Sequence, residues 1–119
     1  MAHIVLPSSG ESLDKANSLK FTDVAIARMV NEMQRRGAQI QNIKAKIFGG
    51  ANMFPEIINA SSDMDIGERN IMAVRKELDT HSIEISFEET GGHIGRSVIL
   101  DTKDGSVVVS SANLNSQEG

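Results

Sequence analysis

The chain has 119 residues, a length typical of one compact domain, and a formal net charge of −4. It has no run of Lys or Arg, and its only aromatic side chains are four Phe, which argues against binding nucleic acid through phosphates or stacked bases. No apolar run is long enough to cross a bilayer, so we expect a cytoplasmic protein without membrane insertion. The absence of cysteine excludes disulfides, cysteine zinc sites and a thiol nucleophile within these residues.

The first third of the chain predicts a strand, a loop and a helix. Ala2–Leu6 is apolar and typical of a strand, whereas Pro7–Leu19 is polar and indicates a surface loop. Thr22 and Asp23 can cap a helix that stops at Gly37. Its apolar residues fall at helical spacing: Ile26, Met29, Val30 and Met33.

The middle of the chain predicts a second strand and a second helix. Ile43–Phe48 alternates apolar and lysine side chains, as a strand does. The following loop, Ala51–Asp65, is too apolar for a free surface loop, so we expect it to pack on another part of the protein. A helix over Gly67–Thr80 follows, because apolar residues recur on one face and basic residues lie toward its C-terminal end.

Three strands are predicted in the last third. Ile83–Phe87 alternates apolar and polar residues. Ser97–Leu100 follows the glycines of the next connection, and the Asp104-Gly105 turn joins it to Ser106–Val109 as a hairpin. We expect one domain over residues 1–109 and a polar, disordered tail over 110–119.

This order of elements predicts an α/β (α+β) fold, with a mixed sheet and two main helices on one face. The apolar side of the last strands then needs a covering layer. A missing layer or one supplied by a partner would satisfy that need.

Three groups of residues are candidates for chemistry. His3 carries an imidazole that can act as a base, although a lone histidine in a strand is more often structural. Two glycine segments, Phe48–Asn52 and Gly91–Arg96, resemble turns that expose backbone N–H groups, and Arg96 can bind a carboxylate or an amide. Neither segment has the spacing of a nucleotide-binding motif, and a structural turn is the commoner explanation.

Metal and serine chemistry are poorly supported. Asp63, Asp65 and Glu68 do not have the spacing of a calcium loop and are better explained as favouring the start of the next helix. His81 and His93 form no zinc spacing with each other or with His3. Ser8 and Ser9 lack a nucleophile elbow. We therefore expect no metal and no cofactor.

Six segments in matching order resemble one family, the chemoreceptor glutamine deamidases of bacterial chemotaxis (CheD). The segments are Met1–Pro7, Asp23–Ile26, Gly37–Ala38, Ala45–Ala51 with Met53–Phe54, Ile66–Asn70 and Gly91–Arg96. The resemblance implies a three-layer α/β/β sandwich and hydrolysis of selected glutamine amides of chemoreceptors to glutamate. Members use a cysteine nucleophile, a histidine base and a threonine that orients the histidine.

His3 matches the family histidine, whereas the family's Thr and Cys precede the Ala-His motif with which this sequence begins. We expect this chain to lack the N-terminal strands that carry them, through a start placed at an internal methionine, a fragment, or a shortened relative that only binds. The residues expected to bind substrate or partner are Phe48, Gly49, Gly50, Ala51, Met53, Phe54, Gly91, Gly92 and Arg96. The resemblance implies two partners, chemoreceptor cytoplasmic helices and a chemotaxis phosphatase (CheC), and exposed sheet edges favour self-association.

Overall fold

The computed structural model describes residues 1–8, 18–52, 65–111 and 116–118. In chain order the elements are η1 (Ser18–Lys20), α1 (Thr22–Arg35), η2 (Ile40–Asn42), β1 (Lys44–Gly49), α2 (Ile66–Thr80), β2 (Glu84–Thr90), β3 (Arg96–Leu100), β4 (Val107–Ser111) and β5 (Ser116–Glu118). No helix among these residues is both long and apolar enough to span a membrane.

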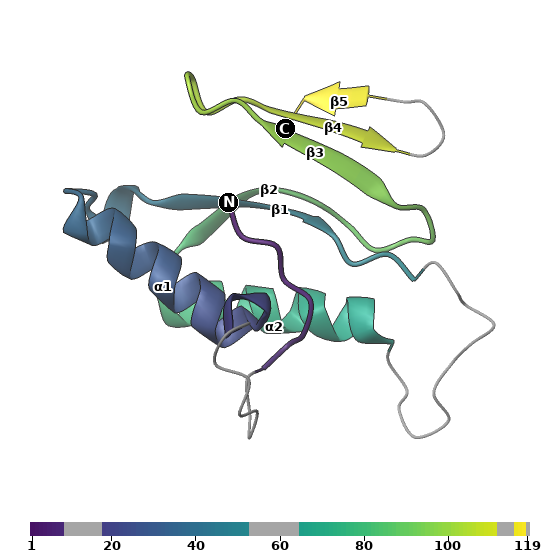
Figure 1. The fold of residues 1–119 in the computed structure, drawn as a ribbon, viewed down its shortest axis with the longest axis horizontal. Helices are drawn as coiled ribbons and strands as arrows, with labels where there is room; N and C mark the ends of the chain where they lie inside the picture. Colours follow the sequence, from purple (N-terminus) through teal and green to yellow (C-terminus); the bar gives the residue numbers. More distant parts are fainter. Residues whose placement is uncertain (9–17, 53–64, 112–115, 119) are drawn as a thin grey trace.

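The elements stack in three layers, as Figure 1 shows: the two helices, the β1–β2 pair, and the sheet of β3, β4 and β5. The α/β fold class is therefore confirmed. The parallel pairing of β1 with β2 and the antiparallel pairing of β3, β4 and β5 lie in two separate sheets, where we expected one mixed sheet. In the third layer Val107 and Val109 of β4 are buried, so much of the apolar side of these strands is covered within the chain itself.

The core lies between the helices and the parallel pair. Its buried members are Ile26, Val30, Ile43, Leu78 and Ile83, which come from α1, α2 and the entries to β1 and β2. The helical spacing of these apolar residues on α1 and α2 directs them to one side of each helix, toward the strands. The core thus fixes β1, α2 and β2 as one unit, with α2 as the crossover between two parallel strands.

The sequence predicted the C-terminal end of α1 correctly and its N-terminal end wrongly. At the C-terminal end Gly37 has φ +104°, and the N–H groups of Gly37 and Ala38 donate to the Gln34 and Met33 carbonyls at 3.0 and 2.9 Å. This is the glycine stop that the sequence predicts. At the N-terminal end the prediction was wrong, because Phe21 is the N-cap and the Thr22 hydroxyl donates to the Leu6 carbonyl at 3.2 Å.

The predicted first strand, Ala2–Leu6, is also wrong. Only Leu6 forms a β-bridge, to Phe21. The N–H groups of Val5 and Leu6 donate to the Lys20 carbonyl at 2.8 and 3.1 Å, and the Thr22 N–H donates to the Leu6 carbonyl at 3.1 Å. The backbone of this segment therefore bonds to the end of η1 and the start of α1. It forms no longer β-ladder among the described residues.

The hairpin at Asp104-Gly105 is confirmed, with Gly105 at φ +78° and Ser106 donating its N–H to the Asp104 carboxylate at 2.9 Å. The strands continue past the predicted start of the tail. Ser110 and Ser111 belong to β4, and β5 pairs with β4. Backbone pairing at a sheet edge needs no apolar side chains, which is why a polar sequence did not indicate it.

Glu88 links the layers at the surface, because Arg75 of α2 donates to its carboxylate and Thr90 donates at 2.8 Å. The Arg75 guanidinium first, and then the Thr90 hydroxyl, lower the pKa of Glu88 from its ordinary value of 4.5. A lowered pKa in the folded state adds stability above the unfolded pKa, and this contribution disappears as pH falls through the folded value. We expect Glu88→Gln to be less stable than the parent at pH about 7 and the difference to shrink as the pH falls below the ordinary value of 4.5, as measured by urea unfolding at several pH values. A difference that does not change with pH would contradict this.

Candidate functional site

The two glycine segments meet at one edge of the fold. β1 and β2 are parallel, so both end at the same edge, where Gly49 lies opposite Thr90. The Gly91 N–H donates to the Gly49 carbonyl and the Asn52 N–H donates to the Gly92 carbonyl, both at 2.8 Å. We call Gly49–Asn52 and Gly91–His93 together the paired glycine turns.

Glycine is required in these turns by backbone geometry. Gly49, Gly50, Gly91 and Gly92 have φ values of +99°, +70°, +82° and +72°. L-residues with a side chain rarely adopt such angles. His93 adds a side-chain contact, since its Nδ1 lies 2.8 Å from the Asn52 carbonyl oxygen. The sequence predicted both turns, and the structure adds that they bond to each other.

The first turn also packs on the beginning of α2. Gly67 is buried, and a Cβ there would overlap the Gly50 carbonyl, with its carbon only 2.8 Å away. A Cβ on Gly50 would in turn lie 2.5 Å from two carbons of the Ile71 side chain. The backbones of β1's end and α2's start therefore touch, which is possible because both positions are glycine.

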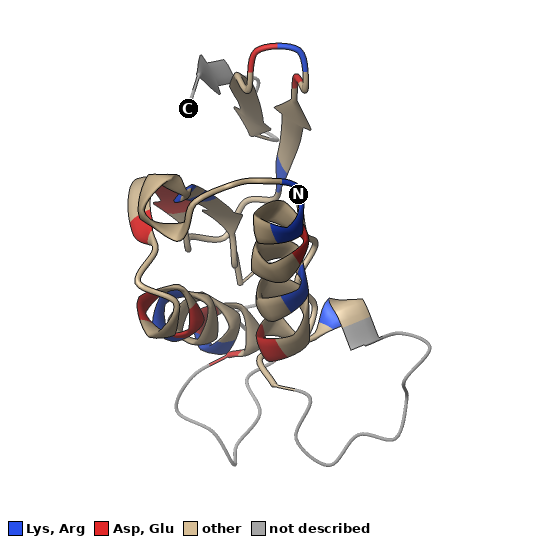
Figure 2. Cartoon of the chain, turned by 90° about the vertical axis from the view of Figure 1, so that its left-hand side faces the viewer, with Lys and Arg blue, Asp and Glu red and all other residues tan. Residues whose placement is uncertain are grey.

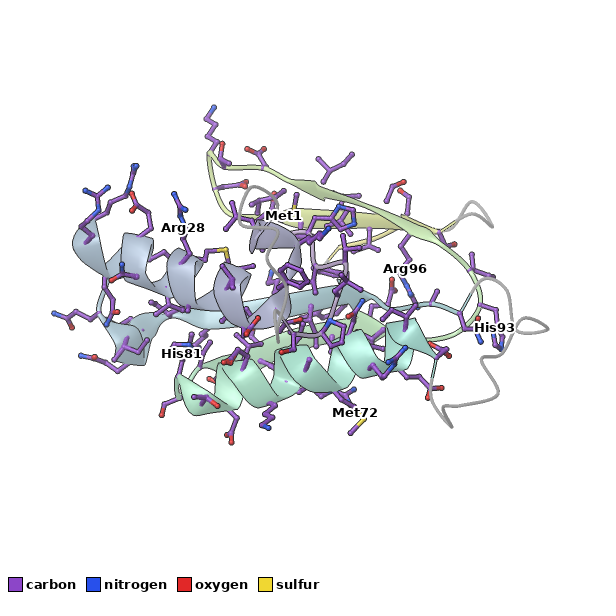
Figure 3. All side chains as sticks on the ribbon, turned by 60° about the horizontal axis from the view of Figure 1, so that its bottom comes forward. Met1, Arg28, Met72, His81, His93 and Arg96 are labelled. Carbon is purple, nitrogen blue, oxygen red and sulfur yellow. The ribbon has the colours of Figure 1, made fainter. Side chains whose placement is uncertain are left out.

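Arg96 connects the turns through its side chain. Only 14% of that side chain is exposed; its Nε donates to Glu89 Oε2 at 3.1 Å and its Nη1 to the Gly49 carbonyl at 3.4 Å. Glu89 comes from the end of β2, so one guanidinium joins β1, β2 and β3. Figure 3 shows Arg96 and His93 on the other side of Met1 from Arg28.

We expect Arg96→Met to lower the free energy of unfolding by about 2 kcal/mol, because it leaves the half-buried Glu89 carboxylate without its cation. Urea unfolding measures the loss. Lys103→Met removes one positive charge from the exposed β3–β4 turn and serves as the control, with an expected change under about 0.5 kcal/mol. Equal losses of unfolding free energy in the two variants would show that Arg96 does not stabilise the paired glycine turns.

His3 lies in a different place, on the extended segment before α1. The hydrogen bonds of Val5 and Leu6 to Lys20 hold that segment, and Asn70 of α2 donates to the Val5 carbonyl at 3.0 Å. The His3 side chain is exposed and lines a hollow of about 860 Å³ beside α1. The described residues that line this hollow are Met1, Ala2, His3, Leu19, Lys20, Ala25, Arg28, Met29, Glu32, Met33, Arg35 and Arg36. None of them belongs to the paired glycine turns.

Other candidates have structural partners or lie outside the described residues. Met53, Phe54, Asp63 and most of the apolar loop are among the residues that the structure does not describe. Asp65 caps α2, since its Oδ1 accepts from the Glu68 N–H at 2.9 Å, which agrees with the predicted role at the helix start. Across the described part of the chain, no group of three or more acidic or histidine residues is arranged to hold a metal ion.

Gly67, Glu89 and Asn70 were not among the predicted site residues. Gly67 resembled an ordinary first-turn residue, and Glu89 lies beyond the predicted strand, which ended at Phe87. Their roles depend on neighbours distant in sequence, such as Gly50 for Gly67. Gly67 and Asn70 both belong to Ile66–Asn70, a segment that carries the family resemblance, and that resemblance was the available signal for their importance.

Comparison with known proteins identifies the family. Residues 5–111 match the family model described as CheD chemotactic sensory transduction. The chain is 47% identical over 118 residues to a probable chemoreceptor glutamine deamidase CheD of Clostridium tetani, covering 99% of this chain and 71% of that protein. This chain belongs to the CheD family. It is also 43% identical over 109 residues to the protein of the same name from Clostridium novyi, covering 92% of this chain and 67% of that protein.

The CheD match divides the candidate residues into two sets. The paired glycine turns, Gly67 and Arg96 fall inside the span of the family model, whereas His3 precedes it. The C. tetani relative matches almost the whole chain. The family resemblance inferred from six short segments is thus confirmed over the length of the domain.

Proposed function

We propose that the protein acts in the cytoplasm as a chemoreceptor glutamine deamidase, with His3 as its general base. The observation that supports this most strongly is the match of nearly the whole chain to relatives named chemoreceptor glutamine deamidase CheD. The exposed imidazole in a hollow suits the role, because a base must reach both a nucleophile and a substrate amide.

The thiol must come from outside these residues, since the chain contains no cysteine. A histidine alone forms no acyl-enzyme, and the family chemistry pairs it with a thiolate. In the proposed reaction the thiolate attacks the glutamine carboxamide carbon, and the protonated His3 transfers its proton to the leaving ammonia. Water then hydrolyses the thioester to glutamate and restores the thiol.

The experiment compares the 119-residue chain with a chimera that carries, ahead of Met1, the N-terminal segment of a CheD protein in which the family's Thr and Cys are present. Each is incubated with the cytoplasmic fragment of a chemoreceptor, and peptides are analysed by mass spectrometry. We expect the chimera to add about 1 Da per converted glutamine and the 119-residue chain to add none. A folded chimera that binds receptor and converts no glutamine would contradict the deamidase function.

The absence of cysteine favours a second candidate, a non-catalytic protein that binds a chemotaxis phosphatase (CheC) or receptor tails. A chain of this kind keeps the folded surface without the nucleophile. A pull-down of purified CheC and of a receptor fragment by the 119-residue chain, with light scattering to detect self-association, tests it. A monodisperse monomer that binds neither protein would count against this candidate.

A further inference from the structure

The segment that carries His3 is attached to the rest of the fold through Val5 and Leu6, the residues that follow shortly along the chain. In Figure 1 this segment runs from the level of the β1–β2 pair to the two helices. Residues 1–8 contain no Lys, Arg, Asp or Glu, whereas both helices carry such charges, as Figure 2 shows. The segment offers none of these side chains for an ion pair, so its attachment relies on hydrogen bonds and packing.

Every backbone polar group of Val5 and Leu6 has a partner. Their N–H groups donate to the Lys20 carbonyl at 2.8 and 3.1 Å, and the Leu6 carbonyl accepts from Thr22. The remaining group, the Val5 carbonyl, accepts from Nδ2 of Asn70 on α2 at 3.0 Å. All these partners lie within the described chain. A further segment ahead of the chain would therefore pair with residues before Val5 and leave these bonds in place.

Stability alone does not explain an asparagine at position 70. The Oδ1 atom of Asn70 is buried and has no hydrogen-bond partner among the described residues. The orientation of the amide is fixed, because the Val5 carbonyl only accepts and must face Nδ2. A buried acceptor without a partner typically costs more free energy than one neutral hydrogen bond contributes. An apolar side chain of similar shape would avoid that cost, so the amide indicates a role other than folding.

We propose that Asn70 is a positioning residue for His3. Asn70 holds the segment from the side of α2, while the Lys20 carbonyl and Thr22 hold it from the side of η1 and α1. Two Cα–Cα steps, at most about 7 Å, separate Val5 from His3, so a displacement of Val5 also moves the imidazole. A misplacement of about 1 Å can lower a catalytic rate about 100-fold. The proposal rests on the proposed deamidase function, in which His3 is the base.

The first measurement shows whether Asn70 holds the segment in the 119-residue chain. Asn70→Leu has a similar branched shape and removes both ends of the amide. We expect its urea midpoint to stay within about 0.5 M of the parent, because the lost hydrogen bond is offset by removal of the unpartnered Oδ1. We expect the amide protons of Val5 and Leu6 to exchange at least about threefold faster, as followed by NMR.

Asn31→Leu is the matched control, because it makes the same replacement at an exposed position of α1 that does not line the hollow. We expect it to leave the exchange of Val5 and Leu6 unchanged. Asn70→Ala removes the same amide and favours a helix, and it carries the same predictions if leucine does not fit. Circular dichroism checks that each variant is folded.

The deciding measurement is a double-mutant cycle in the active chimera, with Asn70→Leu and His3→Asn. If Asn70 acts through His3, Asn70→Leu lowers kcat at least about tenfold when His3 is present and less than about twofold when residue 3 is already asparagine. A loss of general structure would instead lower both rates by the same factor. We expect KM for the receptor fragment to stay within about twofold, because Asn70 is assigned no contact with substrate.

Four outcomes would overturn the positioning role. Equal fold-losses of kcat in the two backgrounds would show that Asn70 acts independently of His3. A raised KM with unchanged kcat would show that Asn70 binds substrate. Unchanged exchange of Val5 and Leu6 would show that Asn70 does not hold the segment, and equal effects of Asn31→Leu and Asn70→Leu would show that the replacement itself is the cause.

Failure of this proposal is distinguishable from failure of the proposed deamidase. If the chimera is active and Asn70→Leu leaves kcat unchanged, the deamidase function stands and the positioning role fails. If the chimera with Asn70 intact converts no glutamine, the deamidase function and the catalytic part of this proposal both fail. Amide exchange in the 119-residue chain then still decides whether Asn70 holds the segment.

Discussion

Gly67→Ala is expected to destabilise the protein by about 3 kcal/mol, because its new Cβ would overlap the Gly50 carbonyl. The overlap is with backbone, so no side-chain rotation relieves it. Either the start of α2 moves away from β1 or the first glycine turn is displaced. Urea unfolding of the variant and the parent chain measures the loss.

The sign of the change in the free energy of unfolding distinguishes the backbone contact from simple helix propensity. Gly67 lies within a helix, where alanine is ordinarily favoured over glycine by about 0.5–1 kcal/mol. Helix propensity alone therefore predicts a more stable protein, and the contact with Gly50 predicts a less stable one. Gly37→Ala is the matched control: it has φ +104° and nothing within 4 Å of its Cβ, so backbone strain alone should cost about 1 kcal/mol. A stabilised Gly67→Ala variant would show that the two backbones do not touch.

The elements that the sequence predicted well are those defined by local pattern. α1 and α2 carry apolar residues at helical spacing, and Gly37 marks where α1 ends. β1 and β2 alternate apolar and polar residues, and Asp104-Gly105 marks a tight hairpin. These signals depend on neighbours within a few residues, and the sequence contains them directly.

The predictions that failed needed partners distant in sequence. Ala2–Leu6 has the apolar character of a strand, but a strand also needs a ladder, and the backbone of Val5 and Leu6 bonds to Lys20 instead. β5 pairs through backbone groups in a polar segment that offered no pattern. In each case the hydrogen-bonding partner decides the structure, and periodicity does not reveal it.

In the candidate site too, the features set by local pattern were predicted and those that depend on distant partners were not. Both glycine turns were predicted as turns, because Gly49-Gly50 and Gly91-Gly92 interrupt strand patterns. The two turns bond to each other because β1 and β2 pair in parallel and end at the same edge. The sequence pattern did not specify that pairing. The family resemblance, not the pattern, selected His3 from the three histidines.

His3→Asn in the active chimera should lower the rate of glutamine conversion at least about 100-fold, because general acid–base catalysis by a positioned imidazole contributes about 10²–10⁴-fold. Asparagine keeps a polar side chain of similar size and loses the ability to take up a proton near neutral pH. The rate is followed by mass spectrometry of receptor peptides, with the affinity for receptor measured separately. We expect that affinity to be retained, because the substitution leaves the arginine and lysine side chains that line the hollow in place.

His93→Asn is the matched control, because it makes the same replacement at another exposed histidine outside the hollow. Its ring contacts the Asn52 carbonyl in the paired glycine turns. We expect this variant to keep the rate within about threefold of the parent, since no proton transfer is assigned to it. If both variants lose activity equally, the imidazole beside α1 has no special role and the paired glycine turns become the better candidate for the catalytic centre. A loss confined to His3→Asn, with receptor affinity and stability unchanged, would assign proton transfer to the hollow beside α1.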